Sequence, residues 1–343
     1  MRAIGLISGG LDSALAAKIM LNMGVEVIGV HFASPFWSGE AGARARRISE
    51  DLGFPLRTIE LGEDYFGVIA SPRHGYGAAM NPCIDCKIFM LKRAKEIMEE
   101  SGALFVFTGE VLGERPMSQG PRALKIIERE SGLEGLLLRP LSAKLLDETL
   151  VEKRGWVSRE GLLALRGRSR RDQIRMAREL GVSGYLTPAG GCLLTDRGFS
   201  AKLLDLLEHG GELSRPEIER LKVGRHFRYG GSKIIVGRNE EENGILRGLK
   251  GPGEVLLEVI GWSGPTALLS GDVSEESIRI AASLTARYSD CKLDAVPVAY
   301  WDGVRGEVSV GRADEGLVEG LRIKWRGRPR LRLILERGGS RGK

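Results

Sequence analysis

The feature that most constrains this 343-residue chain is the stretch Ser8-Gly9-Gly10-Leu11-Asp12-Ser13. The apolar run before it is typical of a buried strand, and apolar residues follow it at helical spacing as far as Met23. Two glycines between a strand and a helix allow a tight turn and bring the backbone close to a ligand. We expect Asp12 or Ser13 to cap the helix. The N–H groups of the first helical turn, together with the helix dipole, would then form an anion-binding site.

Strands and helices alternate through the first part of the chain. Strands are expected at 25–32, 56–61, 104–107 and 136–138, and helices at 40–52, 84–100 and 121–130. This alternation predicts an α/β fold with a parallel, doubly wound sheet. Ligands of such sheets bind at the carboxyl ends of the strands. Four loops should therefore share one face, namely 8–12, 32–37, 108–119 and 139–144.

The pattern changes twice beyond the expected sheet. Residues 147–223 favour helices, with capping boxes at Ser169 and Ser214. From residue 224 a hairpin with a glycine turn begins, followed by a helix from Asn239 and another at 275–288. Further strands are expected at 254–260, 266–270, 294–301, 307–310 and 322–325. We therefore predict two domains, residues 1–223 and a smaller α+β domain at 224–343.

Composition narrows the class of protein. Hydrophobic residues make up 42% of the chain, enough for a sizeable core, and the formal charge is +6. The start of the chain does not have the form of a signal peptide, and no apolar run reaches the length of a membrane span. We expect a cytoplasmic protein with no membrane partner. The sequence does not indicate its oligomeric state.

The sequence of the glycine turn restricts the class of ligand that it can bind. It is neither G-x-x-x-x-G-K-[ST] nor G-x-G-x-x-G. It resembles the S-G-G-x-D-S signature of the PP-loop ATP pyrophosphatases, whose adenine nucleotide alpha hydrolase-like domain splits ATP to AMP and pyrophosphate. This resemblance implies that Asp12 orients the loop or a Mg²⁺ ion. The residues expected to bind ATP are Ser8, Gly9, Gly10, Leu11, Asp12, Ser13, Phe32 and Gly109.

Three of the four cysteines stand in positions that suggest chemistry. Cys83 and Cys86 form a C-x-x-C at a helix start, where thiol pKa values are usually depressed, and Cys192 follows two glycines. One interpretation is that the three thiolates hold a [4Fe–4S] cluster with one open iron. The other is that Cys86 and Cys192 act covalently, through a persulfide and a disulfide. Cys291 has no motif and is expected in the core.

The segment Asn81-Pro82-Cys83-Ile84-Asp85-Cys86 resembles that of the tRNA 2-thiouridine synthases, which are PP-loop enzymes that install sulfur in tRNA. A C-x-x-C with one distant cysteine also resembles the cluster-dependent tRNA thiolases. The chain departs from the former family at Thr108-Gly109-Glu110-Val111 and around Cys192. The resemblance covers roughly residues 1–200 and implies an ATP-dependent tRNA sulfurtransferase. Such an enzyme would adenylate a uridine carbonyl and replace its oxygen with sulfur from an unidentified donor, with Cys86, Cys192 and Asp12 as catalytic residues.

Two regions have the character of RNA-binding segments. A basic run carries Arg168, Arg170 and Arg171, and the stretch from Gly230 to Asn243 resembles the RNA-binding domain of NFACT proteins. That resemblance points to Lys233, Arg238 and Asn239 as RNA contacts. Aromatic residues among arginines can stack on bases, and such residues occur near the end of the chain: Trp262, Trp301, Trp325 and the arginines between 322 and 332.

Two other functions fit the sequence. The chain could be a PP-loop enzyme that adenylates another group and forms an amide, although such an enzyme has no need of three cysteines. It could also be an RNA-binding factor without activity, against which the intact S-G-G-L-D-S stretch argues.

Overall fold

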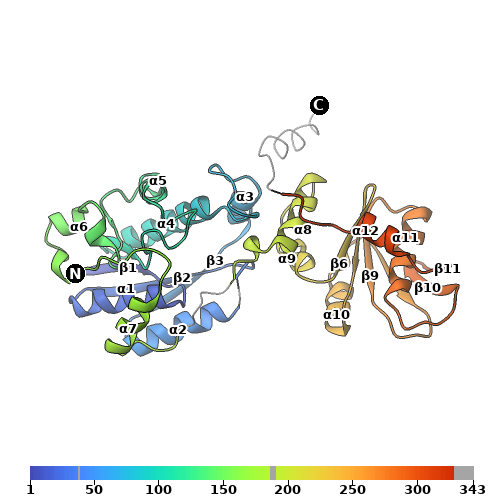
Figure 1. Ribbon diagram of the computed structural model, residues 1–343, viewed down its shortest axis with the longest axis horizontal. Coiled ribbons are helices and arrows are strands. Elements are labelled where there is room, and N and C mark those ends of the chain that lie inside the picture. The colour runs from blue at the N-terminus through green and yellow to red at the C-terminus, as the bar shows by residue number, and fades with distance from the viewer. Residues whose placement is uncertain (38, 186–190, 328–343) are drawn as a thin grey trace. The chain divides into compact units, whose positions relative to one another are not determined.

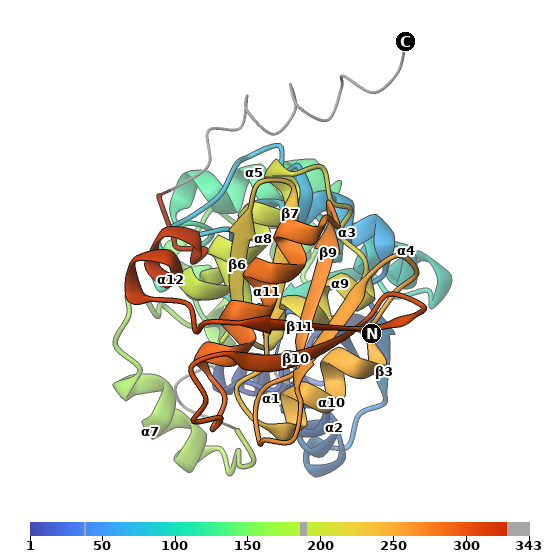
Figure 2. The same cartoon turned by 90° about the vertical axis from the view of Figure 1, so that its right-hand side faces the viewer.

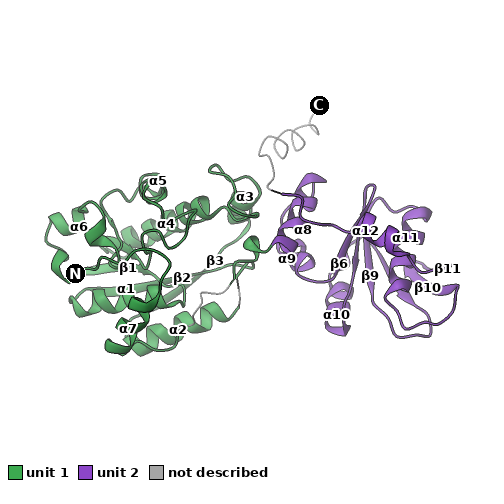
Figure 3. Ribbon diagram, viewed as in Figure 1, with its two compact units in different colours: residues 1–196 green, residues 197–343 purple. Residues whose placement is uncertain are grey.

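The computed structural model describes residues 1–37, 39–185 and 191–327, and the chain divides into two compact units, 1–196 and 197–343 (Figure 3). Several predicted features lie outside the described residues: Pro188 to Gly190 before Cys192, and the arginines and tail beyond residue 327. The sequence placed the domain boundary at 224, where helix α9 (Arg215–Lys222) gives way to the first strand of unit 2. Both α9 and α8 (Arg197–Glu208) belong to unit 2. One reason is that Lys202 of α8 donates hydrogen bonds to the carbonyl oxygens of Leu221 and Gly224.

The sheet of unit 1 has five parallel strands in the order β3-β2-β1-β4-β5. Their bounds are β1 (Arg2–Leu6), β2 (Glu26–Ala33), β3 (Leu56–Glu60), β4 (Phe105–Thr108) and β5 (Leu137–Leu138). This confirms the predicted parallel, doubly wound α/β fold. The chain runs outward from β1 to β3 and then returns to β4 on the other side of β1. The order reverses between β1 and β4, which is where such sheets bind ligands.

Helices cover both faces of this sheet (Figure 1). One face carries α1 (Leu11–Asn22), α2 (Glu40–Leu52) and α7 (Arg171–Glu179), and the other carries α3 (Glu63–Ala70), α4 (Cys83–Glu100) and α5 (Pro121–Ser131). Apolar side chains of α1, α2 and α7 form one buried cluster with strand residues such as Ala3 and Phe107. The short helix α3 was not predicted, because its eight residues contain too few turns to show a period.

The segment after β5 is less helical than the sequence suggested. Between residues 142 and 170 the structure contains the short helix α6 (Leu150–Lys153) and two 3₁₀ turns, Ala143–Leu145 and Arg159–Gly161. The capping box predicted at Ser169 is wrong, since the N-cap of α7 is Arg170. The cap predicted at Ser214 is confirmed, because its hydroxyl accepts the Glu217 N–H.

Unit 2 is an α+β domain with an antiparallel six-stranded sheet in the order β11-β10-β8-β9-β7-β6 (Figure 2). The strands are β6 (Arg225–Tyr229), β7 (Ser232–Val236), β8 (Val255–Val259), β9 (Ala267–Gly271), β10 (Val296–Trp301) and β11 (Arg305–Val310). Helix α11 (Glu275–Arg287) packs on the face that carries Ile234 and Leu269, and α10 (Glu240–Gly248) packs on the opposite face with Ile235 and Leu268. Helix α12 (Glu315–Leu321) is the last helix of the described residues. The strand predicted at 322–325 forms only a single bridge, between Arg322 and Phe227.

Across the described ranges, no helix is both long enough and apolar enough to span a membrane.

Candidate active site

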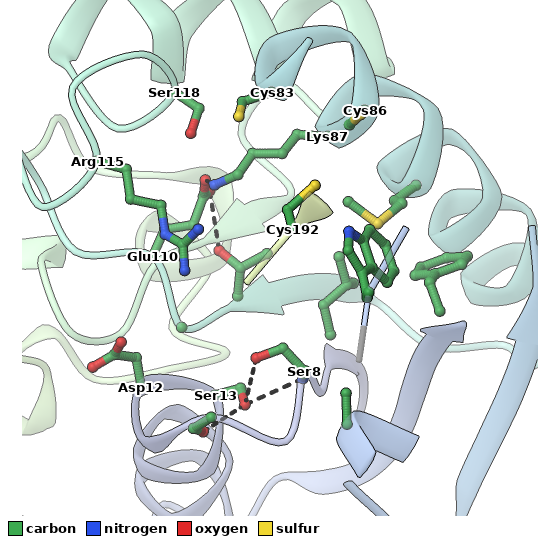
Figure 4. Close-up of a pocket in the computed structure, with 18 of the residues that line it drawn as sticks. Ser8, Asp12, Ser13, Cys83, Cys86, Lys87, Glu110, Arg115, Ser118 and Cys192 are labelled. Carbon is green, nitrogen blue, oxygen red and sulfur yellow. Dashed lines mark hydrogen bonds and ion pairs between the residues drawn. The ribbon is translucent and has the colours of Figure 1, made fainter. Parts of the chain in front are cut away.

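The glycine turn forms a closed loop between β1 and α1. The Ser13 hydroxyl accepts hydrogen bonds from the Ser8 N–H and from the Ser8 hydroxyl, both at 3.2 Å, and donates to the Gly10 carbonyl at 2.9 Å (Figure 4). The N-cap of α1 is Gly10 and no side chain caps the helix, so the prediction that Asp12 or Ser13 would cap it is wrong. Because Ser13 binds inside the turn instead, the N–H groups of the first helical turn remain available to an anion.

Close approach of three segments explains two of the glycines. Gly9 has φ +76°, and a Cβ there would lie 2.6 Å from the Ala41 carbonyl oxygen. A Cβ on Gly109, just after β4, would lie 2.4 Å from the backbone carbon of Asp12. Neither position has room for a larger residue, so the loop after β4 and the start of α2 hold the glycine turn in place.

A cavity of about 330 Å³ opens within unit 1 beside this loop. It is lined by the loops after β1, β2 and β4, as predicted, while the loop at 139–144 does not reach it. Among the residues expected to bind ATP, Leu11 is fully buried in the core. The others all line the cavity: Ser8, Gly9, Gly10, Asp12, Ser13, Phe32 and Gly109.

Asp12 is tied to a second acid through an arginine. Its carboxylate accepts from the Arg170 guanidinium at 3.1 Å, and Glu114 accepts from the same guanidinium at 2.7 Å. Burial and the nearby Glu114 charge raise the pKa of Asp12 to about 6. Within the described chain, Asp12 Oδ1 is buried and has no hydrogen-bond partner. Arg170, which was expected to contact RNA, is therefore ion-paired with Asp12 of the glycine turn.

A largely buried ion network forms part of the cavity wall. Glu110 accepts from Lys87 of α4 and, at 3.0 Å, from Arg139, which also pairs with Glu128 at 3.0 Å. Burial alone would raise the pKa of Glu110, but the charges of Lys87 and Arg139 outweigh it and lower the pKa to about 2. Sequence reasoning assigned no role to these residues. Lys87 could have been noticed because it directly follows Cys86, whereas Arg139 is 29 residues from Glu110 and only the fold joins them.

The three predicted cysteines line the same cavity. Figure 4 shows them beside Lys87, across from Ser8 and Asp12. The Asn81 amide donates to Cys83 Sγ at 3.2 Å, and the Tyr65 hydroxyl contacts Cys86 Sγ at 3.1 Å. Burial raises the pKa of Cys86 far above its usual range and that of Cys192 to about 11. The expectation of a depressed thiol pKa is therefore wrong for Cys86, because burial outweighs the helix N-terminus.

The three thiols line one cavity. In the parts of the chain that the structure covers, no three His, Cys, Asp or Glu side chains are grouped so as to hold a metal ion. Three thiolates are the donor type of an iron–sulfur cluster.

The other predicted RNA contacts differ in their surroundings. Arg168 and Arg171 are exposed on unit 1. In unit 2, Lys233 is only 6% exposed and its ammonium lies 3.5 Å from Asp205. Arg238 pairs with Glu242, and the Asn239 side chain caps α10. Of the three tryptophans, Trp262 is 41% exposed and Trp301 lies under the Arg305 guanidinium.

The strand order, the closed glycine turn and the cavity beside it are the features expected of a PP-loop domain. Comparisons with known proteins narrow this class. Residues 1–149 match the family model described as "Thiamine biosynthesis protein (ThiI)", and residues 224–312 match "NFACT protein RNA binding domain". They confirm the resemblance to a PP-loop domain of the tRNA sulfurtransferase type joined to an NFACT-type RNA-binding domain.

Curated relatives match the N-terminal part of the chain. A "Probable tRNA sulfurtransferase" of Methanothermobacter thermautotrophicus is 31% identical over 148 residues, covering 41% of this chain and 36% of the relative. A "tRNA-specific 2-thiouridylase" of Syntrophotalea carbinolica is 32% identical over 114 residues, covering 30% of this chain and 32% of the relative. The chain thus spans about a third of the length of these relatives.

Two solved structures are also similar in part. One is a 4-thiouridine synthetase–RNA complex with bound ATP, at 26% identity and a TM-score of 0.39, covering 53% of this chain and 41% of that one. The other is the C-terminal part of a fibronectin/fibrinogen-binding protein from Streptococcus suis, at 12% identity and a TM-score of 0.27, covering 70% of this chain and 90% of that one.

Proposed function

We propose that this chain is an ATP-dependent tRNA sulfurtransferase that converts a uridine carbonyl to a thiocarbonyl. One observation carries the proposal: the glycine loop and three cysteine thiols open onto the same cavity of about 330 Å³. An enzyme that only forms amides needs the loop but not the thiols. An RNA-binding factor without activity needs neither. The tRNA sulfurtransferase and thiouridylase relatives of the N-terminal part support the same function.

In the first step the loop binds the ATP phosphates through its backbone N–H groups, with Ser8 and Ser13 holding the turn closed. Mg²⁺ fits beside it, because Asp12 offers a buried, unpartnered oxygen within the described chain and Glu114 supplies a second carboxylate. Bound there, the ion would neutralise phosphate charge. The uridine carbonyl oxygen attacks the α-phosphorus, and pyrophosphate leaves.

In the second step sulfur displaces AMP. We assign a persulfide, supplied by a donor, to Cys86. Its outer sulfur attacks the adenylated carbon and AMP departs. The Cys192 thiolate then attacks the inner sulfur, which forms a Cys86–Cys192 disulfide, releases the thiolated base and leaves a disulfide for a thiol reductant to reduce. The competing version is a [4Fe–4S] cluster, which Cys83, Cys86 and Cys192 would hold from one side of the same cavity, with one iron left open.

We assign tRNA binding to unit 2 together with exposed arginines of unit 1. The match of residues 224–312 to an RNA-binding domain supports the first part. Arg168 and Arg171, which are exposed and have no ion pair with any described residue, support the second. Such an enzyme would work in the cytoplasm, where its tRNA substrate is found.

The test is to incubate the full chain with ATP, an unmodified tRNA transcript, a persulfide donor and a thiol reductant. We expect AMP and pyrophosphate to form in amounts equal to new thiouridine, which nucleoside mass spectrometry measures. Asp12→Ala should abolish the formation of all three products. ATP–pyrophosphate exchange with a small acid and without tRNA would favour amide formation. Binding of tRNA without AMP formation would favour the RNA-binding factor.

A further inference from the structure

Three cationic side chains line the cavity, and they differ in their partners. Arg44 pairs with Glu40 at 2.9 Å, and Lys87 pairs with the buried Glu110. The Arg115 guanidinium, by contrast, has no hydrogen bond or ion pair anywhere in the described chain. An unpaired cation that lines a cavity is available to an anionic ligand, because no internal carboxylate has to be displaced.

The backbone beneath Arg115 is held firmly. The Gln119 side chain accepts the Arg115 N–H at 2.8 Å, and the Gln119 N–H donates to the Arg115 carbonyl at 2.9 Å. The Gly113 N–H completes the turn with a hydrogen bond of 2.8 Å to the Gln119 carbonyl. Gln119 itself is buried. A fixed base with an exposed, unpaired head is the arrangement of a ligand-binding arginine rather than of a loosely tethered surface residue.

The head of Arg115 lies between the two halves of the site. Figure 4 shows its side chain reaching over the cavity, with Asp12 on one side and Cys192 on the other. The same positive charge lowers the pKa of both Asp12 and Cys192, although burial keeps both values raised. One guanidinium therefore acts on the nucleotide loop and on the sulfur-bearing segment at once.

We propose that Arg115 is a catalytic residue that binds the α-phosphate of ATP and, after adenylation, the phosphate of the departing AMP. The inference rests on the proposed function and deepens it. The planar, permanently charged fork of arginine suits two phosphate oxygens. The α-phosphate is the group that must lie between the loop, which binds the pyrophosphate part, and the thiols, which attack the adenylated carbon. A tRNA phosphate is the less favoured ligand, because Arg115 lines the cavity beside the loop.

The experiment compares Arg115→Ala, Arg115→Lys and a control, Arg122→Ala. Like Arg115, Arg122 is exposed, and its side chain has no ion pair or hydrogen bond in the described chain. It lies on α5 and does not line the cavity. AMP formation with saturating tRNA and the persulfide donor is measured in single turnovers, and tRNA affinity is measured separately. We expect Arg115→Ala to slow AMP formation about 100-fold with tRNA affinity unchanged. The rate for Arg115→Lys should lie between those of Arg115→Ala and the wild type. Guanidinium ions at non-denaturing concentration should restore part of the Arg115→Ala rate and leave the control unaffected.

Each alternative has its own signature. Equal rates for Arg115→Ala and the control overturn the inference while the proposed function stands. A loss of tRNA affinity with a normal rate per bound tRNA assigns Arg115 to RNA and overturns it as well. A wild-type chain that forms no AMP overturns the proposed function itself, and the inference with it.

Discussion

The two units each contain a glycine-rich polar motif, and the structure uses the two motifs differently. In unit 1, Ser8 to Ser13 leave the first helical turn uncapped and a buried oxygen of Asp12 without a partner in the described chain. In unit 2, most polar side chains of the stretch from Gly230 to Asn243 bind within the unit, although Lys233 Nζ is buried without a hydrogen bond in the described chain, 3.5 Å from Asp205. Asn239 caps α10, Arg238 pairs with Glu242, and the Glu242 carboxylate also accepts the Gly224 N–H.

The two motifs differ in where their buried polar groups without hydrogen-bond partners lie. A buried polar group without a partner costs free energy, so its persistence beside a cavity marks a place that a ligand completes. Internally satisfied groups instead fix the local fold. We infer that the sequence of a motif does not by itself distinguish a ligand-binding role from a structural one, whereas the hydrogen-bond partners of its polar groups do.

The largest expected effect tests the cysteines of unit 1 against the single cysteine of unit 2. Cys86→Ser and Cys192→Ser should each reduce thiouridine formation by more than about 1,000-fold while pyrophosphate still forms, because adenylation, which releases pyrophosphate, precedes sulfur transfer. Cys291→Ser, in the core of unit 2, should leave thiolation per folded molecule unchanged. Nucleoside mass spectrometry measures the outcome.

Cys83→Ser decides between the two sulfur chemistries. The persulfide mechanism expects Cys83→Ser to retain activity and the purified protein to be colourless. A cluster on three thiolates would instead give a brown protein with about four irons per chain, and Cys83→Ser would be as inactive as the other two variants. Iron content measured after anaerobic purification separates them.

A smaller effect is expected from the glycine behind the nucleotide loop. In Gly109→Ala the new Cβ would lie 2.4 Å from the Asp12 backbone, so the loop must shift. We expect ATP affinity to fall about 100-fold, since misplacement of a binding loop by about 1 Å is costly. Gly244→Ala in α10 is the control, because its Cβ meets no atom within 4 Å. Unchanged ATP affinity in Gly109→Ala, measured by calorimetry, would show that the loop is not held by this contact.

The next effect concerns RNA contacts on unit 1. Replacing Arg168 and Arg171 together by Ala should weaken tRNA binding about tenfold and reduce the salt dependence of log K by about 2, because two phosphate contacts are lost. Arg175→Ala is the control, since Arg175 lies on α7, the helix that begins at Arg171, and is paired with Asp172 at 3.0 Å. An equal loss in the control would mean that only net charge matters.

Much of the fold was predictable because its signals are local. The alternation of strands and helices gave the parallel sheet, and the hairpin at the start of unit 2 follows from Gly230 and Gly231 between two apolar runs. The strand expected at 322–325 failed because the segment forms only one bridge, between Arg322 and Phe227 of β6. A strand needs a neighbour, and the sequence does not show which edge is occupied.

The site was predictable where its residues belong to one motif. The glycine loop lies at the carboxyl ends of the strands as expected and shares its cavity with the cysteines, but the partners of Asp12 were not foreseen. Arg170 is 158 residues away in sequence and looked like part of a basic surface. Its role depends on the path of an irregular segment between α6 and α7, which no periodicity describes.

The smallest effect tests the motif of unit 2. Asn239 has an extended backbone, and its side chain accepts the Glu242 N–H at 2.9 Å, which is the geometry of a helix N-cap. Asn239→Ala should therefore lower the free energy of unfolding of unit 2 by about 1 kcal/mol, while Asn239→Ser, which keeps an acceptor, should lose much less. Denaturant unfolding measures both. If the cap is the whole role of Asn239, tRNA affinity under folding conditions stays within about twofold of wild type in both variants. A tenfold loss of affinity in Asn239→Ala and in Asn239→Ser alike would instead show that the amide contacts RNA, and the contrast between the two motifs would fail at this residue.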